Sequence, residues 1–144
     1  MSGSPLPDAP PAWPENARAF LSENRFAVVA TLDPDGAPHQ AVVWYRLDED
    51  EIVVNSAEGR RWPANLRRDP RIHFVVEDDY RYVGARGVVT VIDDQATAQA
   101  DIAEMARRYH AHEPATAEAL IRDRFEQQHR ISFRFRPSRF NIDL

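Results

Sequence analysis

Two adjacent arginines form the clearest candidate for binding chemistry in the sequence. Arg60 and Arg61 directly follow Gly59, shortly after a run of β-forming residues at 51–55. A glycine lets the backbone approach a ligand closely, so amide N–H groups join the side chains as donors. Arginine also makes bidentate, charge-assisted hydrogen bonds to phosphate. The pattern predicts a phosphate-binding loop, and a solvated basic loop is the alternative.

Aromatic residues supply the second candidate feature. Trp44 and Tyr45 end a run whose other members are small or β-branched, and Tyr80 and Tyr82 are spaced to share one face of a later strand. An aromatic side chain that points outward from a strand packs on a partner subunit or on a flat ring. Core packing is the alternative for Trp44 and Tyr45, and ordinary β-propensity is the alternative for the two tyrosines.

Several other kinds of chemistry lack the residues that they need. The 144-residue chain has no cysteine, which excludes disulfides and thiolate catalysis, and His110 and His112 do not have the i, i+4 spacing of a helical metal pair. We therefore assign no metal. The formal net charge of −5 disfavours general nucleic-acid binding. No apolar run approaches the roughly 18 residues of a membrane span, and no signal peptide is recognisable, so we expect a cytoplasmic protein.

The elements that must position these residues are mainly β-strands. Alternating or β-rich runs separated by polar turns predict an antiparallel meander rather than βαβ units. The expected strands cover 26–32, 38–45, 51–55, 71–77, 80–92 and 131–135, and the last of them continues after Pro137 with Phe140 and Ile142. The expected helices cover 15–22, 64–68, 95–110 and 115–128. Six mostly antiparallel strands predict a small β-barrel with flanking helices. We expect one domain, 15–144, after a proline-rich arm, 1–14, that is disordered or wraps another surface.

The order of four segments resembles a known family. The segments are Phe26-Ala-Val-Val-Ala-Thr-Leu, Asp35-Gly-Ala-Pro, Val43-Trp-Tyr and Asn65-Leu-Arg-Arg-Asp-Pro-Arg. In this order and spacing they resemble the pyridoxamine 5'-phosphate oxidase-like split β-barrels. The run from Gly84 to Asp93 looks like the long strand of that family. The group that the chain resembles most is the F420-dependent (deazaflavin) oxidoreductases.

The resemblance implies a homodimer with two cofactor sites at the subunit interface. The ring of the cofactor would lie along the second strand, near the backbone of Val42, Val43 and Trp44. Its phosphate would lie against the loop that carries Arg60 and Arg61. Many relatives have a phosphate-binding lysine where this chain has Trp62, which would instead cover the ring edge or wall the pocket. The remaining residues that the resemblance assigns to the site are Asn55, Ser56, Asn65 and, from the partner subunit, Tyr80 and Tyr82.

Three functions remain open at this stage. The first is an F420-dependent reductase that passes hydride to a small organic acceptor, which requires little catalytic apparatus because the cofactor carries the chemistry. The second is an FMN-binding oxidoreductase with the same fold, and the third is a non-catalytic flavin- or deazaflavin-binding protein. Additional cations beyond the phosphate loop would favour the long anionic tail of F420. The candidates for such contacts are Arg18, Arg25, Arg134, Arg136 and Arg139. By contrast, Arg67, Arg68 and Arg71 are explained by surface exposure and pairing with Asp69.

Overall fold

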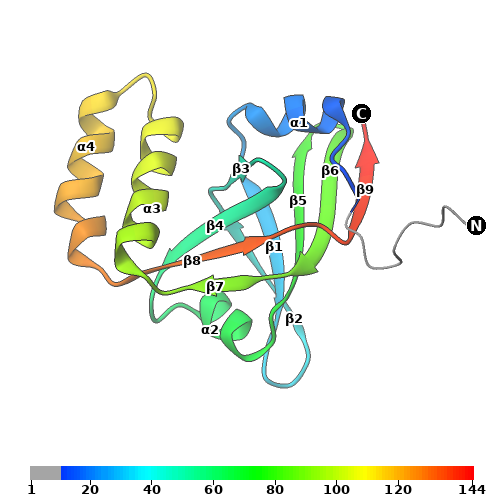
Figure 1. Ribbon diagram of the computed structural model, residues 1–144, viewed down its shortest axis with the longest axis horizontal. Coiled ribbons are helices and arrows are strands. Elements are labelled where there is room, and N and C mark those ends of the chain that lie inside the picture. Colours follow the sequence, from blue (N-terminus) through cyan, green and yellow to red (C-terminus); the bar gives the residue numbers. More distant parts are fainter. Residues whose placement is uncertain (1–10) are drawn as a thin grey trace, which may run out of the picture.

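The computed structural model describes residues 11–144 of the chain (Figure 1). Most of the expected N-terminal arm, residues 1–10, lies outside this range. The described part contains nine strands, four α-helices and one short 3₁₀ helix. The helices are α1 (Glu15–Ser22), α2 (Arg61–Arg68), α3 (Gln95–Tyr109), α4 (Pro114–Asp123) and η1 (Phe125–Gln127). The strands are β1 (Ala27–Leu32), β2 (Pro38–Val43), β3 (Arg46–Asp48), β4 (Glu51–Ala57), β5 (Arg71–Asp78), β6 (Arg81–Val88), β7 (Thr90–Ile92), β8 (Arg130–Phe135) and β9 (Arg139–Asp143).

The strands form two antiparallel sheets. One sheet has the order β2-β1-β5-β6-β9, and the other has the order β3-β4-β8-β7. The prediction of a mainly β fold with flanking helices is confirmed, but the count of six strands is wrong. A short strand, β3, follows Tyr45, and two expected long strands each divide where the chain passes from one sheet to the other. These breaks lie at Val89, between β6 and β7, and at 136–138, between β8 and β9.

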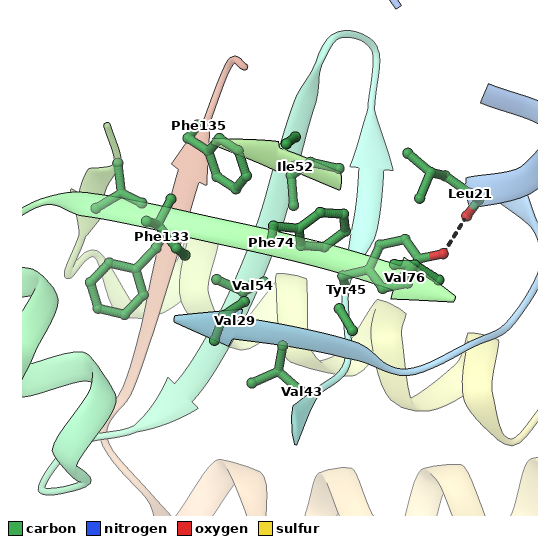
Figure 2. Close-up of a cluster of buried hydrophobic side chains, with 14 of the residues drawn as sticks. Leu21, Val29, Val43, Tyr45, Ile52, Val54, Phe74, Val76, Phe133 and Phe135 are labelled. Atoms are coloured by element: carbon green, nitrogen blue, oxygen red, sulfur yellow. Dashed lines mark hydrogen bonds between the residues drawn. The ribbon is translucent and has the colours of Figure 1, made fainter. Parts of the chain in front are cut away.

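The main core lies between the two sheets. Figure 2 shows side chains from β1 and β5 directed toward those of β4 and β8. Strand alternation explains this layer, because every second residue of β1 and β5 is buried and the intervening ones are exposed or half-buried. Tyr45 is fully buried, and its hydroxyl donates a hydrogen bond of 2.9 Å to the Leu21 carbonyl (Figure 2). This bond joins α1 to the core at the turn that follows β2.

A second apolar cluster lies on the other face of the four-stranded sheet. Helices α3 and α4 pack side by side as a hairpin, on the side of the molecule away from β6 and β9 (Figure 1). Ile102 and Met105 from α3 and Ile121 from α4 cluster there with Val53 of β4. Asp94 caps the start of α3, because its carboxylate accepts the Thr97 N–H at 3.0 Å. The hairpin thus covers the sheet face that carries Val53, Asn55 and Ser132.

The start of the described chain packs tightly. Trp13 falls within the expected arm, yet it is only 4% exposed, and its ring lies 4.5 Å from that of Phe140. Its indole N–H donates to the Asp50 carbonyl at 2.9 Å. Pro14 is the N-cap of α1, which begins at Glu15 as expected. Within residues 11–144, none of the helices has the length and apolar character needed to cross a bilayer.

Candidate functional site

A cavity of about 270 Å³ lies where β2, β4 and α2 meet the α3–α4 hairpin. Six residues singled out in the sequence line it together: Val42, Val43, Trp44, Asn55, Arg60 and Trp62. Five further residues complete the lining: Ile102, Leu120, Arg124, Phe125 and Arg130. The cavity therefore combines an apolar, aromatic wall with three arginines and one amide.

The three arginines of this cavity have no carboxylate partner in residues 11–144. Arg60, Arg124 and Arg130 form no ion pair within 4.0 Å among the described residues, whereas eleven other arginines of that part of the chain do. Burial, followed by the nearby charges of Arg60 and Arg124, lowers the pKa of Arg130 to about 10. Like charges gathered without counterions are costly in the free protein. The cluster is thus suited to an anionic ligand, which would supply the missing charge.

Arg130 is held firmly from one side. It is 5% exposed, and its Nε donates to Oδ1 of Asn55 at 3.0 Å, while Nη1 donates to Oε1 of Gln128 at 2.6 Å. The guanidinium also lies 4.8 Å from the centre of the Phe125 ring. Within residues 11–144, Nη2 donates no hydrogen bond to a protein group. One donor edge of a buried, rigid cation therefore remains available in the cavity.

The aromatic wall of the cavity is also fixed by packing. Trp44 lies beyond the end of β2 and stacks on Tyr109 of α3, with ring centres 5.0 Å apart and planes at 6°. Phe125 meets the Trp44 ring edge-on at 6.3 Å. The expectation that one of Trp44 and Tyr45 packs in the core holds for Tyr45. Trp44 does not point outward from a strand to a partner subunit; it is clamped against the helical hairpin.

Arg61 has a different environment from its neighbour. Its Nε donates to Oδ1 of Asp33 at 2.9 Å, and Nη2 donates to Oδ2 at 2.5 Å, so the pair is bidentate. Hydrogen bonds from Arg61 and then Asn65 lower the pKa of Asp33 to about 2. The Asn65 amide also donates to Thr31 Oγ1 at 3.1 Å. These contacts attach α2 to the end of β1 and to the turn that follows it.

A family model described as pyridoxamine 5'-phosphate oxidase matches residues 13–139. The chain belongs to the pyridoxamine 5'-phosphate oxidase-like family. The match covers strands β1 to β8 and both sides of the cavity, and it includes every residue that lines the cavity. The resemblance found in the sequence is thereby confirmed.

Solved structures share this fold. A conserved hypothetical protein from Mycobacterium tuberculosis is 26% identical, with a TM-score of 0.75 over 95% of this chain and 87% of the other. An F420 reductase is 24% identical, with a TM-score of 0.70 over 90% of this chain and 98% of the other. The heme storage protein HutZ from Vibrio cholerae is 16% identical, with a TM-score of 0.66 over 91% and 94% of the two chains. The F420 reductase and HutZ are less than 25% identical to this chain, so their likeness shows a shared fold only.

The structure places the other residues that the family resemblance assigned to the site away from the cavity. Ser56 is next to Asn55 on β4, so alternation turns it to the opposite face, where it is 2% exposed and donates to the Ala57 carbonyl. Tyr80 is not on a strand; it lies in the turn before β6 and is 93% exposed. Tyr82 lies on β6, half-buried. Neither tyrosine lines the cavity of its own chain.

Sequence reasoning missed Arg124 and Arg130. Arg124 follows α4, and Arg130 begins β8, about 70 residues after the basic loop. One signal was present, because the run Arg130-Ile-Ser-Phe-Arg-Phe alternates polar and apolar residues. Pairing this run with β4 sets Ser132 opposite Asn55 and puts Arg130 on the same face. Sequence alone does not specify that pairing, so the arginine could not be assigned to the cavity.

Glu58, Asp93 and His129 form a separate exposed cluster, with candidate ligand atoms within 4.8 Å of one another. Arg67 donates to both carboxylates, so its guanidinium already occupies the oxygens that a cation would need. The same bonds explain Arg67, which pairs with Glu58 and Asp93 rather than with Asp69. Asp69 pairs with Arg71 at 2.6 Å, as the sequence suggested.

Proposed function

We propose that the chain is an F420-dependent oxidoreductase that transfers hydride between the deazaflavin cofactor and a small organic acceptor. The observation that carries the proposal is a set of three arginines in one cavity, Arg60, Arg124 and Arg130, for which the described part of the chain provides no carboxylate partner. Membership of the pyridoxamine 5'-phosphate oxidase-like family and the fold shared with an F420 reductase support it.

Each part of the cavity has a role in this proposal. Arg130 and Arg60 hold the cofactor phosphate, with the free Nη2 of Arg130 as a charge-assisted donor. Val42, Val43 and the clamped ring of Trp44 provide an apolar surface for the edge of the ring system. When bound, reduced F420 supplies the hydride itself. The chain therefore needs to bind, orient and exclude water, rather than to provide a nucleophile or a metal.

Arg124 favours F420 over FMN. An FMN phosphate needs one compact cluster, whereas F420 continues past its phosphate into a tail with carboxylates. Most cations that the sequence offered for the tail are already paired: Arg18 and Arg136 with Asp50, Arg25 with Asp78, and Arg134 with Asp48 and Glu51. Arg124 forms no ion pair with the residues that the structure describes, and it lies at the α4 side of the same cavity. We assign it to the first charged group of the tail.

A heme-binding role, as in HutZ, has less support. Heme iron is usually held by His, Cys, Met or Tyr. Among the described residues that line this cavity, none is of these types. Non-catalytic binding of a flavin or deazaflavin remains the alternative, and turnover of an acceptor by the loaded protein separates it from the oxidoreductase.

A homodimer completes the proposed site. Pockets for drug-sized ligands usually measure about 300–1,000 Å³, and this cavity is smaller, at about 270 Å³. Val42 belongs both to the cavity lining and to the outer face of the five-stranded sheet, where its side chain is 69% exposed. There it continues a row across the strands with Val28 and Val75. A second copy packed on this face would cover the valines and extend the cavity wall.

Charge on the same outer face indicates how two copies would meet. His73, Arg86 and Arg139 form a basic row on one side of the valine row, and Glu77, Tyr82 and Asp143 form a row on the other side. A twofold axis along the valine row sets each basic row opposite the acidic row of the other copy. Reversing Arg86 and Arg139 to Glu should give monomers in light scattering, and reversing Glu77 and Asp143 to Arg as well should restore dimers. A wild-type species of 16.5 kDa at micromolar concentration would refute the dimer.

The experiment that tests the function is a titration of purified protein with F420 and with FMN, followed by absorbance near 420 and 450 nm, respectively. We expect saturable binding of F420 and weaker binding of FMN. Reduced F420 should then be oxidised when a panel of unsaturated or oxidised organic acceptors is added. Binding of neither cofactor would refute the proposal, and binding without turnover would leave the non-catalytic alternative.

A further inference from the structure

Arg130 connects to a buried carboxylate through a chain of side chains. Its Nε donates to Oδ1 of Asn55 at 3.0 Å, and Nδ2 of Asn55 donates to Oγ of Ser132 at 2.9 Å. Ser132 in turn donates to Oδ2 of Asp101 at 2.7 Å. Asn55 and Ser132 are directly opposed on β4 and β8, and Asp101 comes from α3 above them. All four residues are at most 8% exposed.

The direction of these bonds is fixed by their chemistry. Asp101 also accepts from Nη2 of Arg46 at 2.7 Å, so its charge is balanced at the far end of the chain. As a carboxylate it accepts only, which commits the single Ser132 proton to it. The Ser132 oxygen must then accept from the Asn55 amide, and the Ala98 carbonyl accepts the second amide proton at 3.0 Å. The Asn55 oxygen is consequently turned toward Arg130.

We propose that Asp101 is a positioning residue for the anion site, acting through Ser132 and Asn55 on Arg130. This inference rests on the proposed function. Arg60 and Arg124 repel Arg130, and within residues 11–144 no carboxylate contacts it to offset that repulsion. The Asn55 oxygen holds it without neutralising it, because an amide accepts a hydrogen bond yet carries no net charge. The relay thus keeps Arg130 oriented and fully charged toward the cavity until an anion binds.

Ser132→Ala breaks the relay at its centre, and Ser56→Ala is its matched control. Both serines are buried in the same pair of strands, but Ser56 faces the other way and bonds only to the Ala57 carbonyl. We expect inorganic phosphate to bind Ser132→Ala about tenfold more weakly than wild type, and Ser56→Ala with wild-type affinity. Asn55→Asp keeps the shape and places a charge directly against Arg130. It should weaken phosphate binding about a hundredfold.

The arginine Nε–H signals in ¹H–¹⁵N spectra of the ligand-free protein report the relay without any ligand. The Arg130 signal, assigned by its absence in Arg130→Lys, should be protected from exchange in wild type and Ser56→Ala. It should lose that protection in Ser132→Ala and in Asp101→Asn. Protection and phosphate affinity that both survive Ser132→Ala would overturn the relay. A wild type that shows the protected signal yet binds neither phosphate nor cofactor would instead overturn the proposed function.

Discussion

Two neighbouring arginines at the start of α2 lie in opposite electrostatic surroundings. Arg61 turns toward β1 and makes a bidentate pair with Asp33. Arg60 turns toward the cavity, where its charged neighbours are Arg130 and, through it, Arg124. The first arginine belongs to a neutralised cluster that holds α2 in place. The second belongs to a cluster that has no anionic partner among residues 11–144. The state of neutralisation, rather than the presence of arginine, distinguishes a binding site from a structural one.

Removing the buried cation Arg130 together with the loop cation Arg60 should cause the largest loss of F420 affinity. In Arg60→Met with Arg130→Met, each lost charge-assisted bond to a partly buried anion costs about 1.5–3 kcal/mol. F420 affinity should therefore fall at least a hundredfold, and about a thousandfold in the middle of that range. Fluorescence titration measures the change, and the circular dichroism spectrum checks that the fold is intact. A fall of less than tenfold would show that the anion binds elsewhere.

Adding a carboxylate to the cavity should neutralise its arginines, as Asp33 neutralises Arg61. Leu120 lies half-buried in the lining, on α4 near Arg124. Leu120→Glu should pair with an arginine and weaken phosphate binding about tenfold, in the range expected for one competing charged contact. Leu120→Gln has the same size without the charge, and it should bind phosphate like wild type. Equal losses in the two variants would mean that shape, not charge, is responsible.

Alkaline pH should weaken the binding of anions in the cavity. Burial and the neighbouring arginines lower the pKa of Arg130 to about 10, from an ordinary 12.5. Its charge in the folded protein is present below about pH 10 and is lost above it. In the ligand-free protein the resulting loss of stability is therefore complete below about pH 10 and fades as the pH rises from 10 toward the ordinary 12.5. Sulfate, which does not titrate in this range, should bind with constant affinity from pH 8 to 9 and several-fold more weakly by pH 10.5. Calorimetry of Arg130→Met, which has already lost this charge, should show a flatter profile.

Acid pH should reduce the stability that the Arg61–Asp33 pair contributes. This is the smallest of the four predicted effects. Because the Arg61 guanidinium holds the pKa of Asp33 at about 2, below the ordinary 3.8, the folded state binds this proton less readily than the unfolded chain. The stabilisation is complete above about pH 4 and is lost as the pH falls toward 2. Urea unfolding at pH 6 and pH 3 should give a smaller difference in unfolding free energy for Arg61→Ala than for wild type. An unchanged difference would remove the role assigned to this pair.

Local patterns were sufficient to predict most elements of the fold. Helix α1 has the expected bounds, α3 ends one residue before the expected position, and β1, β4 and β5 lie where the β-rich runs placed them. The division of β6 from β7 could not be foreseen, because the alternation of buried and exposed residues continues unchanged through Val89. Helix α2 begins at Arg61, three residues before the expected start at residue 64. Because of this earlier start, Arg61 lies on the helix, whereas Arg60 is its N-cap.

The site was only partly predictable for a related reason. Residues contributed by the β2 and β4 segments and the basic loop lie close in the sequence, and six of them meet in the cavity. Arg124 and Arg130 enter through a non-local strand pairing and a helical hairpin, which no local pattern encodes. Asn65 shows the opposite error, since a motif that marks the family here makes structural hydrogen bonds to Thr31 and Asp33.

The most direct test compares F420 affinity in two single variants, Arg130→Met and Arg61→Met, by fluorescence titration under identical conditions. The account predicts about a tenfold to hundredfold loss for Arg130→Met, since an uncompensated cation is removed from the anion. It predicts a change of less than about threefold for Arg61→Met, because that charge already belongs to Asp33. Wild-type affinity in Arg130→Met together with a large loss in Arg61→Met would contradict it.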